Sequence, residues 1–112
     1  MSQLSIIIPT LSEEKWIERT LLTVKGCAPN AEILVVDGGS SDTTVVRAGK
    51  YTRVISAKRG RGGQLNTGVA ATQGDILLFL HADTLPDAAG LRELMEVMQD
   101  ERILGGSFPY AL

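Results

Sequence analysis

The fold is decided by the stretch Asp75-Ile76-Leu77-Leu78-Phe79-Leu80-His81-Ala82-Asp83-Thr84. Its five apolar residues, 76–80, are too few to cross a membrane and are typical of a strand buried on both faces. The run ends at His81, and Asp83 follows two residues later. In an extended chain these two side chains point to the same side. Because ligands of open α/β sheets bind beyond the carboxyl ends of the strands, His81 and Asp83 form the first candidate site.

Strands and helices are predicted to alternate through the rest of the chain. Apolar, β-branched runs predict three further strands at residues 4–8, 33–36 and 53–55. The spacing of apolar residues predicts helices over 12–25, 42–49 and 64–72, a further helix from Pro86 onward, and a last strand over 105–110. This order predicts an α/β fold of three layers, α/β/α, with a mainly parallel sheet and right-handed crossovers.

Local details of these helices are also predicted. Ser12 is expected to cap the first helix, with Glu13 and Glu14 in its first turn and Gly26 at its end. Residues 58–63 are expected to form a basic, glycine-rich loop. The side chains expected to face inward from the third helix are Leu65, Val69 and Thr72.

Composition and charge narrow the class of protein. The 112 residues predict one domain, and a hydrophobic content of 44% supports a core. A net charge of −2 predicts neither a nucleic-acid nor a membrane partner. No acidic residue lies between Asp42 and Asp75, and six basic ones do, which indicates either an anion-binding face or a solvated basic face. These six are Arg47, Lys50, Arg53, Lys58, Arg59 and Arg61.

The single cysteine, Cys27, allows no internal disulfide and no cysteine-based zinc site. We expect it to fill space near a helix end. The sequence has no pattern of a signal peptide and no apolar run long enough for a transmembrane segment, so a cytoplasmic location is expected.

Polar residues follow three of the predicted strands, at Pro9-Thr10-Leu11, Asp37-Gly38-Gly39 and His81-Ala82-Asp83. In a parallel sheet these ends converge on one rim, and a nucleotide fits such a rim. The glycines match neither a dinucleotide fingerprint nor a P-loop. Asp83 suits Mg²⁺ or Mn²⁺ beside phosphates, and His81 adds a nitrogen ligand that Mn²⁺ tolerates. Alternatively, Asp83 is a turn residue and His81 a half-buried side chain bonded to a backbone carbonyl.

Four motifs in order resemble the nucleotide-sugar-binding half of a family 2 glycosyltransferase of the GT-A fold. They are Ser5-Ile6-Ile7-Ile8-Pro9-Thr10-Leu11-Ser12-Glu13-Glu14, Val35-Val36-Asp37-Gly38-Gly39-Ser40-Ser41-Asp42, Gly60-Arg61-Gly62-Gly63-Gln64-Leu65-Asn66-Thr67-Gly68 and Gly74-Asp75-Ile76-Leu77-Leu78-Phe79-Leu80-His81-Ala82-Asp83. The segment 80–84 is most similar to a bacterial subgroup of selenodomain-associated or arsenosugar-associated transferases.

The resemblance implies a UDP- or GDP-linked sugar as donor and a divalent cation, Mg²⁺ or Mn²⁺, as cofactor. It implies that Asp37 contacts the base and that Asp83, with His81, holds the cation where the family has its DxD motif. The implied nucleotide-binding residues are Pro9, Thr10, Leu11, Glu13, Asp37, Gly38, Arg61, Asn66 and Ala82.

The chain departs from the family pattern in three ways. Gly38 stands where many members have a second aspartate, and His81 stands at the first DxD position. The chain also ends soon after the DxD strand, where relatives continue with the acceptor site and the catalytic base. We therefore expect weak nucleotide and metal binding and little or no sugar transfer.

Two other interpretations stay open. One is a non-catalytic fragment or interaction module that forms a homodimer through an open sheet edge. The other is a nucleotidyltransferase-like enzyme on a related sheet, although the basic glycine-rich segment comes after the third strand rather than the first.

Overall fold

The computed structural model describes residues 3–83 and 93 and confirms the alternation of strands and helices. The strands are β1 (Leu4–Thr10), β2 (Glu32–Asp37), β3 (Arg53–Ser56) and β4 (Ile76–Phe79). The helices are α1 (Ile17–Cys27), α2 (Thr44–Ala48) and α3 (Arg61–Ala71). The helix expected from Pro86 and the strand expected over 105–110 lie outside the described residues.

All four strands are parallel, in the order β3-β2-β1-β4. The register pairs Thr10 with Asp37 and Asp37 with Ser56, so the strand ends that carry polar residues lie side by side. The chain moves outward from β1 through β2 to β3 and then returns to the other side of β1 with β4. The strand order therefore reverses between β1 and β4, which is the position where open α/β sheets bind ligands.

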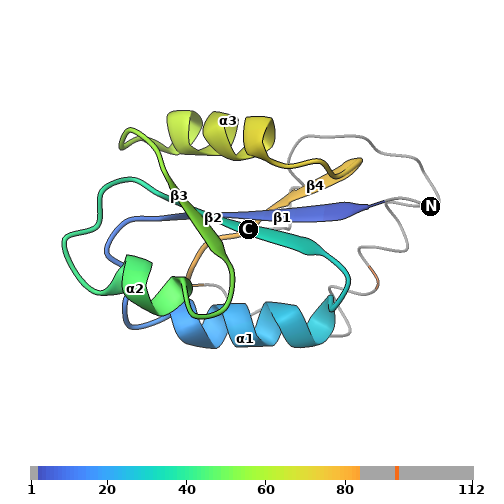
Figure 1. Ribbon diagram of the computed structural model, residues 1–112, viewed down its shortest axis with the longest axis horizontal. Helices are drawn as coiled ribbons and strands as arrows, with labels where there is room; N and C mark the ends of the chain where they lie inside the picture. The colour runs from blue at the N-terminus through green and yellow to red at the C-terminus, as the bar shows by residue number, and fades with distance from the viewer. Residues whose placement is uncertain (1–2, 84–92, 94–112) are drawn as a thin grey trace.

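Helices cover both faces of the sheet, as Figure 1 shows: α1 and α2 lie on one face and α3 on the other. On the α1 side, Ile6, Ile8 and Leu78 pack with Leu21 and Val24. On the α3 side, Ile7, Val36 and Phe79 form a smaller core with the partly buried Leu65. Since both faces of β1 are buried, its run of isoleucines is explained by the three-layer fold. Within residues 3–83 and 93, no helix is long and apolar enough to span a membrane.

Helix α3 approaches the sheet through small and polar residues rather than through an apolar stripe. Its buried residues are Gln64 and Gly68, and a Cβ on Gly68 would lie 2.6 Å from Cγ2 of Ile7. Leu65 packs against the core as predicted, but Val69 is 40% exposed, so its predicted inward position is wrong. The contact is set by Gly68, because only a residue without a side chain lets the helix come this close. Thr72 lies just beyond the end of the helix.

Helix α1 begins later than predicted. Its N-cap is Trp16, and Ser12 instead has a φ of 57°, in the left-handed region. The predicted cap at Ser12 is wrong because the loop before the helix is held by Ser40, in the loop after β2, and by Thr44, in α2. Gly26 lies inside the helix, which ends one residue later at Cys27.

The segment 58–63 is only partly a loop. Helix α3 begins at Arg61, with Gly60 at the N-cap in a conformation with φ 135° that favours glycine. Arg61 therefore lies in the first turn of a helix, and the predicted loop boundary at residue 63 is wrong.

Candidate functional site

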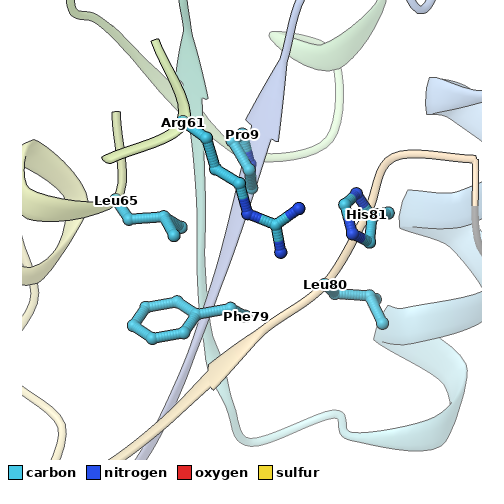
Figure 2. Close-up of a pocket in the computed structure, with 6 residues that line it drawn as sticks. All are labelled: Pro9, Arg61, Leu65, Phe79, Leu80 and His81. Carbon is cyan, nitrogen blue, oxygen red and sulfur yellow. The ribbon is translucent and has the colours of Figure 1, made fainter. Parts of the chain in front are cut away.

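The point where the strand order reverses carries a small pocket. Figure 2 shows it, with the guanidinium group of Arg61 reaching toward the His81 side of the opening. The lining residues are Pro9, Arg61, Leu65, Phe79, Leu80 and His81. The pocket thus joins two of the three strand ends that the sequence predicts to converge, those of β1 and β4, and adds the start of α3.

Asp37, at the end of β2, is the centre of a dense hydrogen-bond network. It is 3% exposed. Its Oδ1 accepts from the hydroxyls of Thr10 (2.7 Å) and Ser40 (2.5 Å). Its Oδ2 accepts from the backbone N–H groups of Gly39 (3.0 Å) and Ser40 (2.8 Å). Burial is the largest single influence and raises the pKa of Asp37, but the bonds from Ser40, Thr10 and Gly39 together hold that pKa below its usual value.

These four bonds occupy the four lone-pair positions of the carboxylate. A nucleoside base would have to replace one of them to reach Asp37. The contact between Asp37 and the base therefore stays a prediction, whereas the role of Asp37 in holding the loop after β2 follows from its geometry.

Two hydroxyl groups tie this loop to the loop after β1. Ser40 donates to Asp37 and accepts from the N–H of Ser12 at 2.7 Å. Thr44 donates to Asp42 and accepts from the N–H of Glu13 at 2.8 Å. Each hydroxyl acts as donor to its own loop and acceptor from the other, which a carboxylate cannot do. This explains why Ser12 is drawn away from the helix it was predicted to cap.

Gln64 is a residue of this region that the sequence reasoning missed. It is 5% exposed and lies on α3, yet its Nε2 donates to the carbonyl oxygens of Thr10 (3.0 Å) and Val36 (2.9 Å). Its Oε1 accepts from the N–H of Gly60 at 3.3 Å. One amide therefore joins the ends of β1 and β2 to the segment before α3. Its place in the Gly60–Gly68 motif is the only signal that could have singled it out.

The same amide explains Gly38. A Cβ on Gly38 would lie 2.7 Å from Oε1 and 2.8 Å from Cδ of Gln64, closer than real Cβ contacts. The space that a side chain at position 38 would take is filled by Gln64. The departure from the family pattern at Gly38 is therefore matched by a buried glutamine on the facing helix.

Carboxylates that follow three different strands influence one another electrostatically. Burial first, and then the negative charges of Asp83 and Asp42, raise the pKa of Glu13 above its usual value. Glu13 follows β1, Asp42 follows β2 and Asp83 follows β4. The rim thus concentrates negative charge from three separate segments, an arrangement that favours a cation.

The residues after β4 alternate between core and rim. Leu80 and Ala82 are 5% and 2% exposed and belong to the core on the α1 side, whereas His81 is half-buried and Asp83 is exposed. The predicted common direction of His81 and Asp83 fits this alternation. Ala82 is buried, and its carbonyl oxygen accepts a hydrogen bond from the hydroxyl of Thr20 on α1.

Positive charge lies at the start of α3. Lys58, Arg59 and Arg61 are exposed, and none of them forms an ion pair within the part of the chain that the structure describes. By contrast, Arg47 contacts Glu18 at 2.7 Å, so it is part of the contact between α1 and α2 rather than of the rim. Asn66 is exposed on α3, one turn beyond Arg61.

The possible metal ligands of the rim suit a cation that already carries other ligands. Among residues 3–83 and 93, no cluster of three or more His, Cys, Asp or Glu side chains could hold a metal ion by itself. Mg²⁺ and Mn²⁺ bound to a diphosphate need only one or two protein carboxylates, and the phosphates supply further oxygens. Asp83, with His81 beside it, matches such a partial site.

The fold is an open α/β sheet with acidic groups and exposed basic groups at the reversal of strand order, which is the position where such sheets bind ligands. The chain belongs to glycosyl transferase family 2, whose family model matches residues 5–111. The α/β fold matches that of GT-A glycosyltransferases, which confirms the predicted fold class.

Two named relatives support this assignment. Glucosyl-3-phosphoglycerate synthase of Mycobacterium tuberculosis is 32% identical over 94 residues, covering 73% of this chain and 29% of the relative. Dolichyl-phosphate beta-glucosyltransferase of Mus musculus is 31% identical, covering 87% of this chain and 37% of the relative. The chain thus spans about a third of the length of such relatives.

A solved structure adds ligands to the comparison. The Mycobacterium tuberculosis synthase in complex with Mn²⁺, UDP and glucosyl-3-phosphoglycerate matches with a TM-score of 0.77 and 29% identity. The match covers 87% of this chain and 39% of the solved one. Another structure of the same synthase contains Mg²⁺ and UDP.

Proposed function

We propose that this chain binds a nucleoside-diphosphate sugar together with Mg²⁺ or Mn²⁺ and forms the donor side of a glycosyltransferase. The observation that carries the proposal is the arrangement of charge at the reversal point of the sheet. Glu13 follows β1 and Asp83 follows β4, and the charge of Asp83 reaches Glu13, whose pKa it helps to raise after burial. Arg61, at the start of α3, lines the same pocket as Pro9 and His81. A diphosphate with its cation presents both signs of charge, so it complements both groups.

Each part of the rim has a proposed role. The segment Pro9–Leu11 and Glu13 would line the nucleoside pocket, with Gly38 and Asp37 behind it. Arg61 and Asn66 would face the phosphates and sugar from α3. Asp83, helped by His81, would be the protein's ligand to the cation, and Ala82 would place the backbone between them.

A bound divalent cation would neutralise the negative charge of the departing diphosphate. The chain's own residues would hold and orient the donor so that an acceptor hydroxyl can attack the anomeric carbon, with inversion. No residue among 3–83 and 93 is assigned the part of catalytic base or acceptor site, and we propose that these belong to the remainder of a complete enzyme.

The proposal is tested by calorimetric titration of the chain with UDP and with GDP, each with and without Mn²⁺. Because Asp83 alone supplies few ligands, Mn²⁺ by itself should bind weakly, and UDP should bind more tightly when Mn²⁺ is present. Asp83→Ala should remove this Mn²⁺-dependent gain and leave the metal-free affinity for UDP unchanged.

A matched control is available beside the same strand. Asp75 is an exposed aspartate just before β4, at the opposite end of the strand from Asp83. Asp75→Ala should keep the full effect of Mn²⁺. Absence of binding to every nucleoside diphosphate tested would refute the proposal, and an equal loss in both variants would refute the role of Asp83.

Three further features are proposed from the sequence alone. The membership of a selenodomain- or arsenosugar-associated subgroup, a cytoplasmic location and a homodimer through the sheet edge are still predictions. The family match favours the glycosyltransferase interpretation over that of a non-catalytic module.

A further inference from the structure

The backbone between His81 and Asp83 is held from a distant part of the chain. Thr20, at the end of the first turn of α1, is 1% exposed, and its hydroxyl donates to the carbonyl oxygen of Ala82 at 2.5 Å. The two residues are 62 positions apart in the sequence. The contact thus connects the helix between β1 and β2 to the segment that leaves β4.

The position of this bond decides what it controls. The Ala82 carbonyl belongs to the peptide unit that leads into Asp83, so fixing its oxygen fixes the plane from which the Asp83 side chain departs. Leu80 and Ala82 are packed into the core on the α1 side and set the depth of the segment. Packing without a directional bond would leave the rotation of the peptide plane free.

We propose that Thr20 is a positioning residue for the cation-binding side chains, acting through the Ala82 carbonyl. This inference rests on the proposed function, because it takes Asp83 as a ligand to the cation that accompanies the nucleotide. Thr20 itself is buried beneath the rim and touches neither nucleotide nor cation. Groups behind a metal ligand that fix its orientation change metal affinity by roughly 10- to 100-fold when they are removed.

The deciding substitution is Thr20→Val, which keeps the branched shape and removes the hydroxyl. The same exchange one turn along α1, Thr23→Val, is the matched control, since the Thr23 hydroxyl donates at 2.8 Å to the Arg19 carbonyl within the helix. Thr20→Ser keeps the hydroxyl and should behave as the wild-type chain does. Each variant is titrated with UDP over a series of Mn²⁺ concentrations, and its thermal unfolding is recorded.

We expect Thr20→Val to raise the Mn²⁺ concentration needed for half of the gain in UDP affinity by about 10- to 100-fold. The affinity for UDP without metal should stay within about twofold, because the β1 and β2 side of the rim is held by other bonds. Thr23→Val and Thr20→Ser should leave both quantities unchanged. If Thr20→Val does not fold, Thr20→Ser and Thr20→Ala, which lose the same methyl group and differ only in the hydroxyl, make the same comparison.

Failure of the proposed function and failure of the positioning role would give different results. A wild-type chain without any effect of Mn²⁺ on UDP binding would refute the proposed function and this inference with it. A wild-type effect that persists unchanged in Thr20→Val would refute the positioning role alone. A parallel loss of metal-free and metal-dependent affinity would also overturn it, because it would show that Thr20 supports the whole rim rather than the cation-binding segment.

Discussion

The rim has two sides that are built differently. At the ends of β1 and β2, the carboxylate of Asp37 accepts four hydrogen bonds and the amide of Gln64 makes three. At the end of β4, Asp83 is exposed, and neither its side chain nor that of His81 forms a hydrogen bond or ion pair within residues 3–83 and 93. On the β1–β2 side, the polar groups form hydrogen bonds within the protein. On the β4 side, the polar atoms of His81 and Asp83 stay available to a ligand.

This difference separates stability from ligand binding. A polar group whose bonds are all made inside the protein contributes to a fixed shape, and its removal leaves buried partners unsatisfied. A polar group that is exposed contributes little to folding, so its chemistry is open to a ligand. Substitutions on the β1–β2 side should therefore lower the free energy of unfolding, and those on the β4 side should change binding alone.

The largest loss of stability is expected for Asp37→Asn. An asparagine has about the same size but places an N–H₂ group against donors that now point at a carboxylate oxygen. Whichever oxygen is replaced, two donors lose their acceptor, so the free energy of unfolding should fall by about 3 kcal/mol at pH 7, measured by urea denaturation.

The pH dependence of this loss has a definite sign. The folded pKa of Asp37 lies below its usual value of 3.8. The stabilisation by the charged carboxylate is therefore present above the unfolded pKa and is lost as the pH falls through the folded pKa. The gap between wild type and Asp37→Asn should be full at pH 5 to 7 and shrink below pH 3.8; a gap that widens on acidification would contradict the network.

A loss of about 2 kcal/mol is expected for Gln64→Ala, because the buried carbonyl oxygens of Thr10 and Val36 each lose a donor. Asn66→Ala on the same helix is the control. Asn66 is exposed, so its removal should change the free energy of unfolding by less than about 0.5 kcal/mol. Equal effects of the two substitutions would show that Gln64 does not join the strand ends.

A smaller, coupled effect is expected for Gly38→Ala. The added Cβ would lie 2.7 Å from Oε1 of Gln64, so it should destabilise the wild-type chain. In the Gln64→Ala background the same methyl group has room, and its cost should fall by about 1 kcal/mol. A double-mutant cycle of unfolding free energies measures this coupling, and additive effects would refute the contact.

Much of this rim could be predicted from the sequence because its signals are local. The buried runs of β1, β2 and β4 carry their own pattern of apolar residues, and parallel strands bring their ends together. Gln64 could not be predicted in the same way, because a glutamine on a helix is usually solvated and its partners lie 28 and 54 residues away. The start of α1 was missed for a related reason, since Ser12 is held by Ser40 of another loop rather than by its own helix.

The smallest effect on stability is expected for Asp83→Ala, on the open side of the rim. Asp83 is exposed, and its charge lies near Glu13, whose pKa it raises along with burial. Removing it deletes no bond within residues 3–83 and 93 and relieves a repulsion between like charges, so the free energy of unfolding should change by less than about 0.5 kcal/mol. Urea denaturation without metal measures this.

A large loss of stability would mean that Asp83 is a structural turn residue, the alternative that the sequence leaves open. An unchanged stability together with a lost response to Mn²⁺ would show that the β4 side of the rim is maintained for a ligand and not for the fold.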